Sequence, residues 1–339
     1  MTQFGFCVPI FAMPGGDLFR TPNYERLDAK TSFDMAVTAD RLGYDSLWVA
    51  DHLFLGRDDE ILEGWTTLAA LAGVTQRAKL GMIHMAHFLR HASMTAKMTA
   101  TLDQLSGGRL IHFVDGGNRA EEFSAYGLPW AEPVEARIER IVEELQVTLA
   151  LWTQQGPVDF AGRFHNLRGA RCTPHPVQEP HPPIWLGEPN PAMLEAVARY
   201  AQGWNSVPVS VADLKQRLQL LAKACEDVGR PYDEIEKSLE MQILIAPDVE
   251  GIRSKLQHML ALNPPATEDP QMQAFLSSQT DTPPEALTRM TLVGTPDQVV
   301  DQIQAYVDLD VSHFLLWFLD APDEAGLRLF IDQVAPHCR

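Results

Sequence analysis

The sequence predicts an α/β fold, a (β/α)8 TIM barrel with insertions, because strand-like apolar runs alternate with amphipathic helices along the chain and number eight. Several of these runs are apolar at successive residues, as parallel strands covered on both faces are. A barrel core takes about 250 residues. The chain has 339 residues, which leaves room for insertions. The alternative is a doubly wound open sheet, but no GxGxxG motif follows the first strand to support it.

The predicted strands are short and spread over the whole chain. In order they are Phe4–Pro9, Ser46–Val49, Leu80–His84, Leu110–Val114, Ile184–Leu186, Trp204–Val207, Leu239–Ile245 and His313–Phe318.

The helices between the strands show apolar stripes and capping signals. Apolar residues recur at helical spacing from Val134 to Leu149. Ser210 begins a capping box, and Gly229 ends the helix that follows it. Thr295-Pro296-Asp297-Gln298 combines an N-cap, a proline at the first helical position and a Gln at N3. The last predicted helix carries its stripe from Leu327 to Val334.

We expect a single domain over residues 1–339, with insertions near 156–183 and 262–290. The first insertion has six prolines from Gly156 to Pro183 and an apparent hairpin at Phe160–Phe164. The second has two Pro-Pro pairs and no sustained periodicity, which is typical of a mobile excursion or lid. No segment has the length and composition of a linker between domains.

The charge balance excludes two classes of partner. There are 27 Lys plus Arg against 45 Asp plus Glu, a net charge of −18. Such a field repels nucleic acid and anionic membrane surfaces. The four cysteines are far apart and form no CxxC pair, so neither a zinc site nor a disulfide framework is indicated. Without a basic leader or an apolar run of membrane-spanning length, the expected compartment is the cytoplasm.

In a barrel of this kind the functional residues lie at the C-terminal ends of the strands. Asp51-His52 follows the second strand. A histidine there can exchange a proton near neutral pH, and Asp51 could influence its charge. A purely structural histidine is the equal alternative.

Three further strand ends carry candidate residues. His84, His87 and His91 follow the third strand, but they have no obvious carboxylate ligand beside them, and we expect no metal site. Asp115-Gly116-Gly117-Asn118 follows the fourth strand, where paired glycines either let the backbone approach a ligand or make a tight turn. Gly187-Glu188 after the fifth strand has the same two interpretations.

Four segments together resemble the bacterial-luciferase-like flavin and deazaflavin oxidoreductases. They are Leu42-Gly43-Tyr44-Asp45-Ser46-Leu47-Trp48-Val49-Ala50-Asp51-His52-Leu53, Leu102-Asp103-Gln104-Leu105-Ser106-Gly107-Gly108-Arg109, Gln178-Glu179-Pro180-His181-Pro182-Pro183-Ile184-Trp185-Leu186-Gly187 and Ala198-Arg199-Tyr200-Ala201-Gln202-Gly203-Trp204-Asn205. They occur in the family's order over nearly the whole chain.

The resemblance implies a luciferase-like barrel that holds a flavin over the strand ends. It puts His52 at a catalytic or cofactor-contacting position and Ile83–His84 where some deazaflavin-using members carry a non-proline cis peptide. It also implies cofactor contacts for Asp51, the 115–118 turn and Gly187-Glu188. The chain departs from the family in three places. Asn118 stands where sugar-phosphate dehydrogenases carry a glutamate, Glu188 replaces a common glycine, and Arg90-His91-Ala92 replaces Arg-His-Pro.

Three functions remain open on this basis. The leading one is a monooxygenase that uses reduced FMN and O2 on a small organic substrate, with a separate NAD(P)H:flavin reductase as partner. The second is a reductase or dehydrogenase dependent on the deazaflavin coenzyme F420. The segment around Arg230-Pro231-Tyr232-Asp233 resembles presumptive deazaflavin members. The third is a non-catalytic flavin-binding relative. In each case a homodimer is expected.

Overall fold

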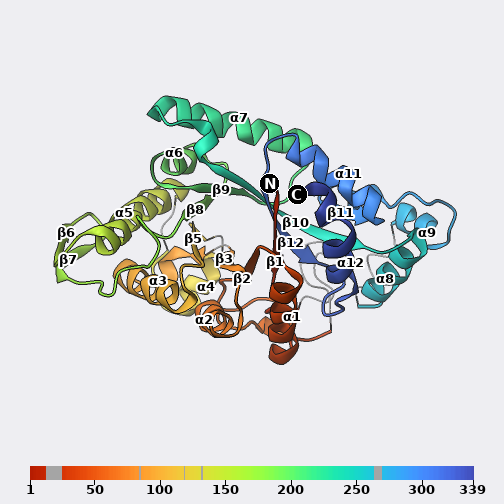
Figure 1. Cartoon of the computed structure of the whole chain (residues 1–339), viewed down its shortest axis with the longest axis horizontal. Helices are drawn as coiled ribbons and strands as arrows, with labels where there is room; N and C mark the ends of the chain where they lie inside the picture. Colours follow the sequence, from red (N-terminus) through yellow and green to blue (C-terminus); the bar gives the residue numbers. More distant parts are fainter. Residues whose placement is uncertain (13–24, 84, 118, 131–132, 263–268) are drawn as a thin grey trace.

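The computed structural model describes residues 1–12, 25–83, 85–117, 119–130, 133–262 and 269–339. Within this part of the chain, eight parallel strands close into a ring in the order β1, β2, β3, β5, β8, β9, β10 and β12, and β12 pairs again with β1. Helices surround the ring, and the two termini lie close together (Figure 1). The predicted (β/α)8 barrel is confirmed.

The barrel strands match the eight predicted segments. They are β1 Gln3–Cys7, β2 Ser46–Ala50, β3 Lys79–Ile83, β5 Leu110–Asp115, β8 Ile184–Gly187, β9 Gly203–Ser206, β10 Glu236–Ile245 and β12 His313–Phe318. Two short strands were not predicted: β4 Met85–Ala86 pairs with β5, and β11 Thr291–Gly294 pairs with the end of β10.

The described helices fill the connections between the strands. They are α1 Ala29–Leu42, α2 Gly64–Val74, α3 Ala92–Ser106, α4 Ala120–Ala125, α5 Val134–Thr153, α6 Pro191–Tyr200, α7 Val211–Val228, α8 Val249–Leu262, α9 Pro270–Leu276, α10 Glu285–Thr288, α11 Pro296–Val307, α12 Ala325–Gln333 and α13 Ala335–Cys338, with single 3-10 turns at Arg57–Asp59, His87–Leu89 and Tyr232–Glu234. The predicted caps are present: Ser210 accepts from the backbone N–H of Asp213, and Thr295 begins a complete capping box.

Large rings fill the barrel interior, and glycines on neighbouring strands make room for them. A Cβ added to Gly81 would lie 2.2 Å from the ring of Trp48, so no larger residue fits there. The Trp48 ring centre lies 5.3 Å from that of Trp185 and 6.1 Å from that of Phe113. These contacts join strands that are not neighbours in the sheet, so all three side chains point into the barrel.

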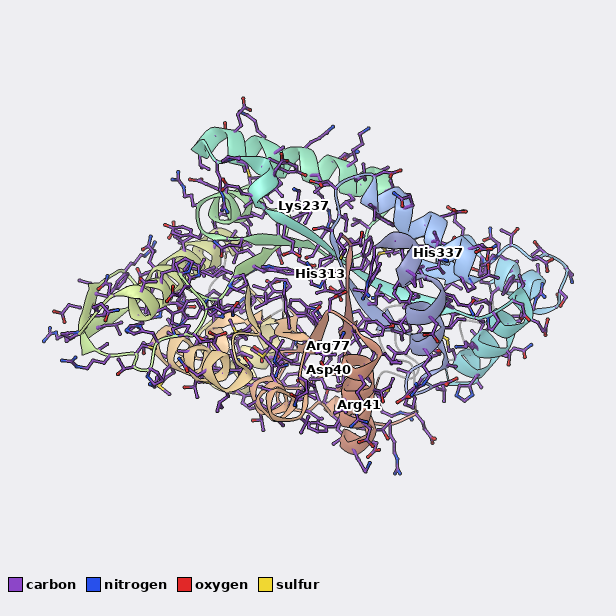
Figure 2. All side chains as sticks on the ribbon, viewed as in Figure 1. Asp40, Arg41, Arg77, Lys237, His313 and His337 are labelled. Atoms are coloured by element: carbon purple, nitrogen blue, oxygen red, sulfur yellow. The ribbon has the colours of Figure 1, made fainter. Side chains whose placement is uncertain are left out.

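A buried hydrogen-bonded chain lies beside these rings. The indole Nε1 of Trp48 donates to Ser46 Oγ over 2.8 Å, so the hydroxyl proton of Ser46 is directed to His313 Nε2, 2.7 Å away. His313 Nδ1 then donates to Glu236 Oε1 over 3.0 Å. His313 is fully buried and lies in the middle of the molecule (Figure 2). This row of hydrogen bonds resembles a Ser-His-acid triad. Its polar groups bond to one another inside the core, and we therefore interpret it as structural.

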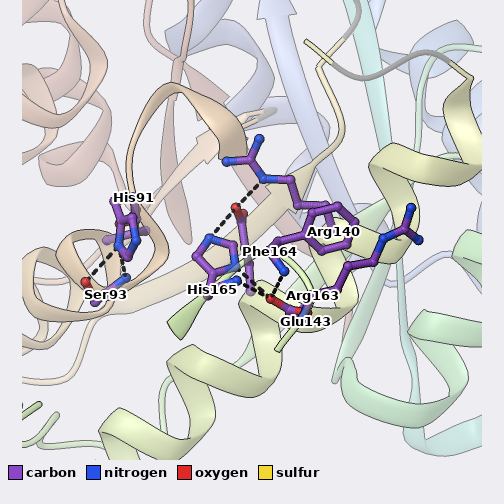
Figure 3. Close-up of polar contacts among 9 residues, drawn as sticks. His91, Ser93, Arg140, Glu143, Arg163, Phe164 and His165 are labelled. Atoms are coloured by element: carbon purple, nitrogen blue, oxygen red, sulfur yellow. Dashed lines mark hydrogen bonds and ion pairs between the residues drawn. The ribbon is translucent and has the colours of Figure 1, made fainter. Parts of the chain in front are cut away.

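The first predicted insertion contains a β-hairpin, β6 Val158–Ala161 and β7 Asn166–Ala170, at one end of the molecule (Figure 1). The carboxylate of Glu143 on α5 holds its turn by accepting the backbone N–H groups of Arg163, Phe164 and His165 over 2.6, 2.8 and 2.6 Å. The His165 ring lies between Glu143 and Glu144, with its Nε2 3.2 Å from Glu144 Oε1 (Figure 3). The insertion is therefore docked on α5.

The described part of the second predicted insertion, 262–290, is helical and packed on the barrel, and its predicted mobility stays a prediction. Met272 and Phe275 of α9 and Leu287 of α10 are buried in a second apolar cluster, together with α8 and the ends of β10 to β12. Arg253 of α8 donates to the carbonyls of Phe275 and Thr280 over 2.8 and 2.9 Å. The helices α9 and α10 have only 7 and 4 residues, too few to show a period in the sequence.

None of the helices in the described ranges combines the length and apolar character that a membrane span requires.

Candidate active site

The candidate residues gather at the C-terminal end of the barrel. Alternate residues of a strand point to the same face. Trp48 and Phe113 point inward, so Ala50 and Asp115 continue the inward faces of β2 and β5, and His52 follows Ala50 at the same parity. Asp115 at the end of β5 thus points towards the barrel mouth, and His52 lies at the same end of the barrel, two residues after β2.

His52 is fixed by a carboxylate that the sequence did not single out. Its Nδ1 lies 2.7 Å from Oε1 of Glu122, which belongs to α4. The other oxygen of Glu122 accepts the backbone N–H of Leu53 over 2.9 Å. The Glu122 side chain is 2% exposed and that of His52 is 25% exposed. Because a carboxylate accepts, this geometry places the imidazole proton on Nδ1 and leaves Nε2 for a ligand.

Arg119 balances the charge of this pair. Its Nε lies 3.3 Å from Glu122 Oε1 and 2.9 Å from Glu121 Oε1. Its guanidinium also donates to the carbonyl of Phe54 and stacks over that ring at 5.4 Å. The buried carboxylate of Glu122 therefore has a histidine, a backbone amide and a guanidinium as its partners.

Asp51 forms an ion pair with Arg90 that the sequence did not predict. Its side chain is 1% exposed and accepts two hydrogen bonds from Arg90, at 2.8 and 3.0 Å. Arg90 also donates to Glu63 over 2.6 Å, and Glu63 caps α2. Burial raises the pKa of Asp51, and Arg90 opposes that rise. Asp51 thus anchors the backbone just before His52, and its predicted cofactor contact stays a prediction.

Ile83 ends β3 beside Ala50, its register partner on β2, and is 2% exposed. His84 lies outside the described residues, and so does the cis peptide that the family resemblance suggested there. Ile83 therefore lies at the mouth, on the strand next to β2, which His52 follows.

Asp115 and the glycines after it form a compact turn. The N–H of Gly117 donates to Asp115 Oδ1 over 3.2 Å, and Gly117 has the positive φ of 68° that a glycine accepts. A Cβ on Gly116 would lie 3.9 Å from Nε of Arg137, whose guanidinium covers the ring of Trp130 at 4.3 Å. Asn118 lies outside the described residues. The turn thus brings bare backbone and a cation to the same strand end.

Gly187 and Glu188 lie beside that turn. A Cβ on Gly187 would be 3.4 Å from Asp115 Oδ2, so the two strand ends adjoin. Glu188 has a φ of 72°, and its carbonyl accepts from Nε1 of Trp204 over 3.1 Å. Its carboxylate attracts Arg217 of α7, which donates to Ser206 Oγ over 3.0 Å. The charge of Glu188 is therefore opposed by a nearby cation.

The described histidines do not form a metal centre. His91 is the N-cap of α3, where its Nδ1 accepts the N–H of Ser93, and its ring contacts His165 at 5.1 Å. No group of three metal-ligating side chains occurs among the residues that the structure describes.

Sequence reasoning missed Glu122, Arg119, Arg90 and Arg217. Glu122 lies 70 residues from His52, and Arg90 lies 39 from Asp51. In the sequence each resembles an ordinary charged residue of a helix or a loop. The one available signal was position, because Glu122 and Arg119 follow a strand end that already carried candidate residues.

Comparison with known proteins agrees with this fold. The family model described as luciferase-like monooxygenase matches residues 4–313. The phthiodiolone/phenolphthiodiolone dimycocerosates ketoreductase of Mycobacterium tuberculosis is 28% identical, over 92% of this chain and 93% of that protein. An F420-dependent glucose-6-phosphate dehydrogenase of Nakamurella multipartita is 28% identical, over 90% and 91%.

Solved structures show the same fold at low identity. An F420-dependent secondary alcohol dehydrogenase aligns with a TM-score of 0.78 and 20% identity, over 100% of this chain and 99% of that one. EDTA monooxygenase from Chelativorans sp. BNC1 aligns with a TM-score of 0.80 and 17% identity, over 99% and 93%. The match over residues 4–313 shows that the chain belongs to the luciferase-like family of oxidoreductases.

Proposed function

We propose that the protein is an F420-dependent oxidoreductase that interconverts a small secondary alcohol and its carbonyl compound. The observation that carries the proposal is the His52–Glu122 pair, which fixes one imidazole nitrogen and leaves the other at the barrel mouth. The ketoreductase and the F420-dependent dehydrogenase named above add support, because both resemble this chain over nearly their whole length.

The residues of the mouth fit a phosphate-bearing, tricyclic cofactor. Gly116, Gly117 and Gly187 present backbone without side chains at two adjoining strand ends. Arg137 lies beside Gly116, and the charge of Arg217 interacts with those of Asp213 and Glu188. Ile83 is the apolar residue at the end of β3, and in this proposal the cofactor ring lies next to it. In this proposal these residues hold the cofactor, and F420 supplies or accepts a hydride when it is bound.

His52 then handles the proton of the reaction. During alcohol oxidation the hydroxyl proton would move to Nε2 of His52, and bound F420 would supply the hydride acceptor that the oxidation requires. Glu122 accepts from Nδ1 throughout and stabilises the imidazolium that results. In the reverse direction the same Nε2 returns the proton to the carbonyl oxygen.

The second candidate is a reduced-FMN monooxygenase, which the description of the matching family model and the EDTA monooxygenase fold favour. In that case His52 would orient or protonate bound oxygen, and the separate reductase remains a required partner. The homodimer also stays a prediction.

One titration separates the candidates. The purified protein is titrated with reduced F420 and, separately, with reduced FMN, and both Kd and oxygen uptake are measured. We expect tighter binding of F420 and no oxygen uptake. Tight binding of reduced FMN with stoichiometric oxygen uptake would favour the monooxygenase instead.

A further inference from the structure

Arg119 shares one carboxylate oxygen with the ring of His52. Oε1 of Glu122 lies 2.7 Å from Nδ1 of His52 and 3.3 Å from Nε of Arg119. The same Nε donates to Oε1 of Glu121 over 2.9 Å. Glu122 is buried, whereas Arg119 is half-buried and Glu121 is exposed. A single guanidinium therefore lies between two acids, and one of these acids holds the His52 ring.

The charges around His52 come from two sides. At α4 and its N-cap, Arg119 opposes the acids, and the charge of Glu121 interacts with that of His52. On the β2 side, the charge of Asp51 also interacts with that of His52, but two hydrogen bonds tie this carboxylate to Arg90. Arg119 is therefore the cation that offsets the acids of α4.

These charges act in opposite directions on the proton of His52. A carboxylate that accepts from Nδ1, as Glu122 does, stabilises the imidazolium and raises the affinity of the ring for a proton. A base that already holds its proton cannot accept one from an alcohol, so a general base works best when its proton affinity matches the working pH. The guanidinium of Arg119 repels an imidazolium and offsets the charge of the oxygen that both share.

We infer that Arg119 is a positioning residue, which lowers the proton affinity of His52 through Glu122 and so extends the pH range in which Nε2 can accept a proton. Arg119 also donates to the carbonyl of Phe54 over 3.1 Å, so the same side chain holds the segment that follows His52. This role rests on the proposed function, in which His52 exchanges the proton of the reaction. The proton affinity itself is measured without F420 and without turnover.

The test follows the His52 ring by NMR in the full chain with isotope-labelled histidine, between about pH 5 and 9. The variant His52→Asn assigns the signal. In Arg119→Gln the midpoint of the titration should lie about 0.5–1 pH higher than in the wild type, because the opposing cation is gone. In Glu121→Gln it should lie lower, because one acid is removed and Arg119 keeps its contact with Glu122.

Two further variants serve as controls. Arg119→Lys keeps the positive charge, so its midpoint should lie closer to that of the wild type than the midpoint of Arg119→Gln does. Arg328→Gln removes the same charge from an exposed ion pair on α12 and should leave the midpoint unchanged. A shift in Arg119→Gln no larger than that in Arg328→Gln overturns the assignment, and so do shifts of the same sign in Arg119→Gln and Glu121→Gln. A merely structural Arg119 would lower the melting temperature without moving the midpoint.

The pH dependence of kcat/KM for alcohol oxidation with F420 is the second readout. Its acid limb reports the loss of the unprotonated base, so it should move to higher pH in Arg119→Gln and to lower pH in Glu121→Gln. If the NMR midpoints move as expected but F420 supports no oxidation, Arg119 controls the proton affinity of His52 and the proposed function is wrong. If the midpoints do not move, Arg119 lacks this role whatever the activity.

Discussion

At the scale of single residues, the site depends on carboxylates that are buried but fully engaged. Glu122 and Asp51 are 2% and 1% exposed, and each accepts at least two hydrogen bonds. Burying a charge is costly unless it is paired. The partners of these two acids are therefore as important to the site as His52 itself, and Arg90 is the clearest case.

Arg90→Ala should destabilise the fold strongly, because it leaves the buried carboxylate of Asp51 without its cation. Loss of one partner of a buried pair costs about 3–5 kcal/mol. Arg90→Lys keeps the charge but loses the bidentate contact with Asp51, so it should destabilise the fold less than Arg90→Ala does. Urea unfolding measures both. Arg328→Ala is the control, since its pair with Glu324 is half exposed and contributes about 1 kcal/mol or less. Equal losses for Arg90→Ala and Arg328→Ala would show that Asp51 does not need Arg90.

At the scale of elements, the sequence predicted those parts whose signal is local. All eight barrel strands appear as apolar runs, and the helix starts at Ser210 and Thr295 carry their own caps. β4 has two residues and α10 has four, and neither is long enough to show a period. The sequence also could not predict that the hairpin docks on Glu143. That contact joins a side chain to backbone N–H groups about 20 residues further along the chain.

Gly162→Ala should loosen the hairpin from α5. A Cβ at this position would lie 2.4 Å from the carboxyl carbon of Glu143, so that carboxylate must move away from the three N–H groups it accepts. Overpacking of this kind costs about 1–3 kcal/mol. Hydrogen exchange of the amides of Arg163, Phe164 and His165 should accelerate roughly tenfold or more.

The matched control is Gly73→Ala on α2. A Cβ there meets nothing within 4 Å, and alanine favours a helix, so stability should be unchanged or slightly higher. If the hairpin amides exchange at the same rate in Gly162→Ala and Gly73→Ala, Glu143 does not hold the turn.

At the scale of the whole molecule, the fold class, the barrel mouth and the family followed from the sequence, whereas the pairing of charges did not. Strand order fixes which ends meet, so His52, Ile83 and Gly187 could be placed at one mouth from their positions alone. The pairing of cations with acids depends on the directions of side chains from helices that are distant in the sequence. The charge interaction between Arg217 and Glu188 is an example.

Stability should fall as the pH drops below about 6.5, the ordinary pKa of histidine. Burial, together with the charge of His181, lowers the pKa of His112 to about 3. Burial also lowers the pKa of His165 and His91. Between the ordinary and the lowered pKa, the unfolded chain binds more protons than the folded one, so stability is full above about pH 6.5 and is lost towards pH 3.

Urea unfolding between pH 7.5 and 4.5 measures this slope. In His112→Phe the ring contact with Trp152 is kept as an aromatic pair, but the proton linkage is gone. Its stability should therefore depend less steeply on pH than that of the wild type. An unchanged slope would mean that His112 does not contribute to acid instability.

The proton-exchange role of His52 is tested most directly by single-turnover kinetics with F420 and a panel of small secondary alcohols and their ketones. His52→Asn keeps an N–H that can donate to Glu122 but cannot exchange a proton, and His337→Asn is the exposed control. We predict that His52→Asn slows hydride transfer by about 10²–10⁴-fold per folded molecule, with little change in melting temperature or in the Kd for F420. A rate per folded molecule equal to that of His337→Asn would contradict the account.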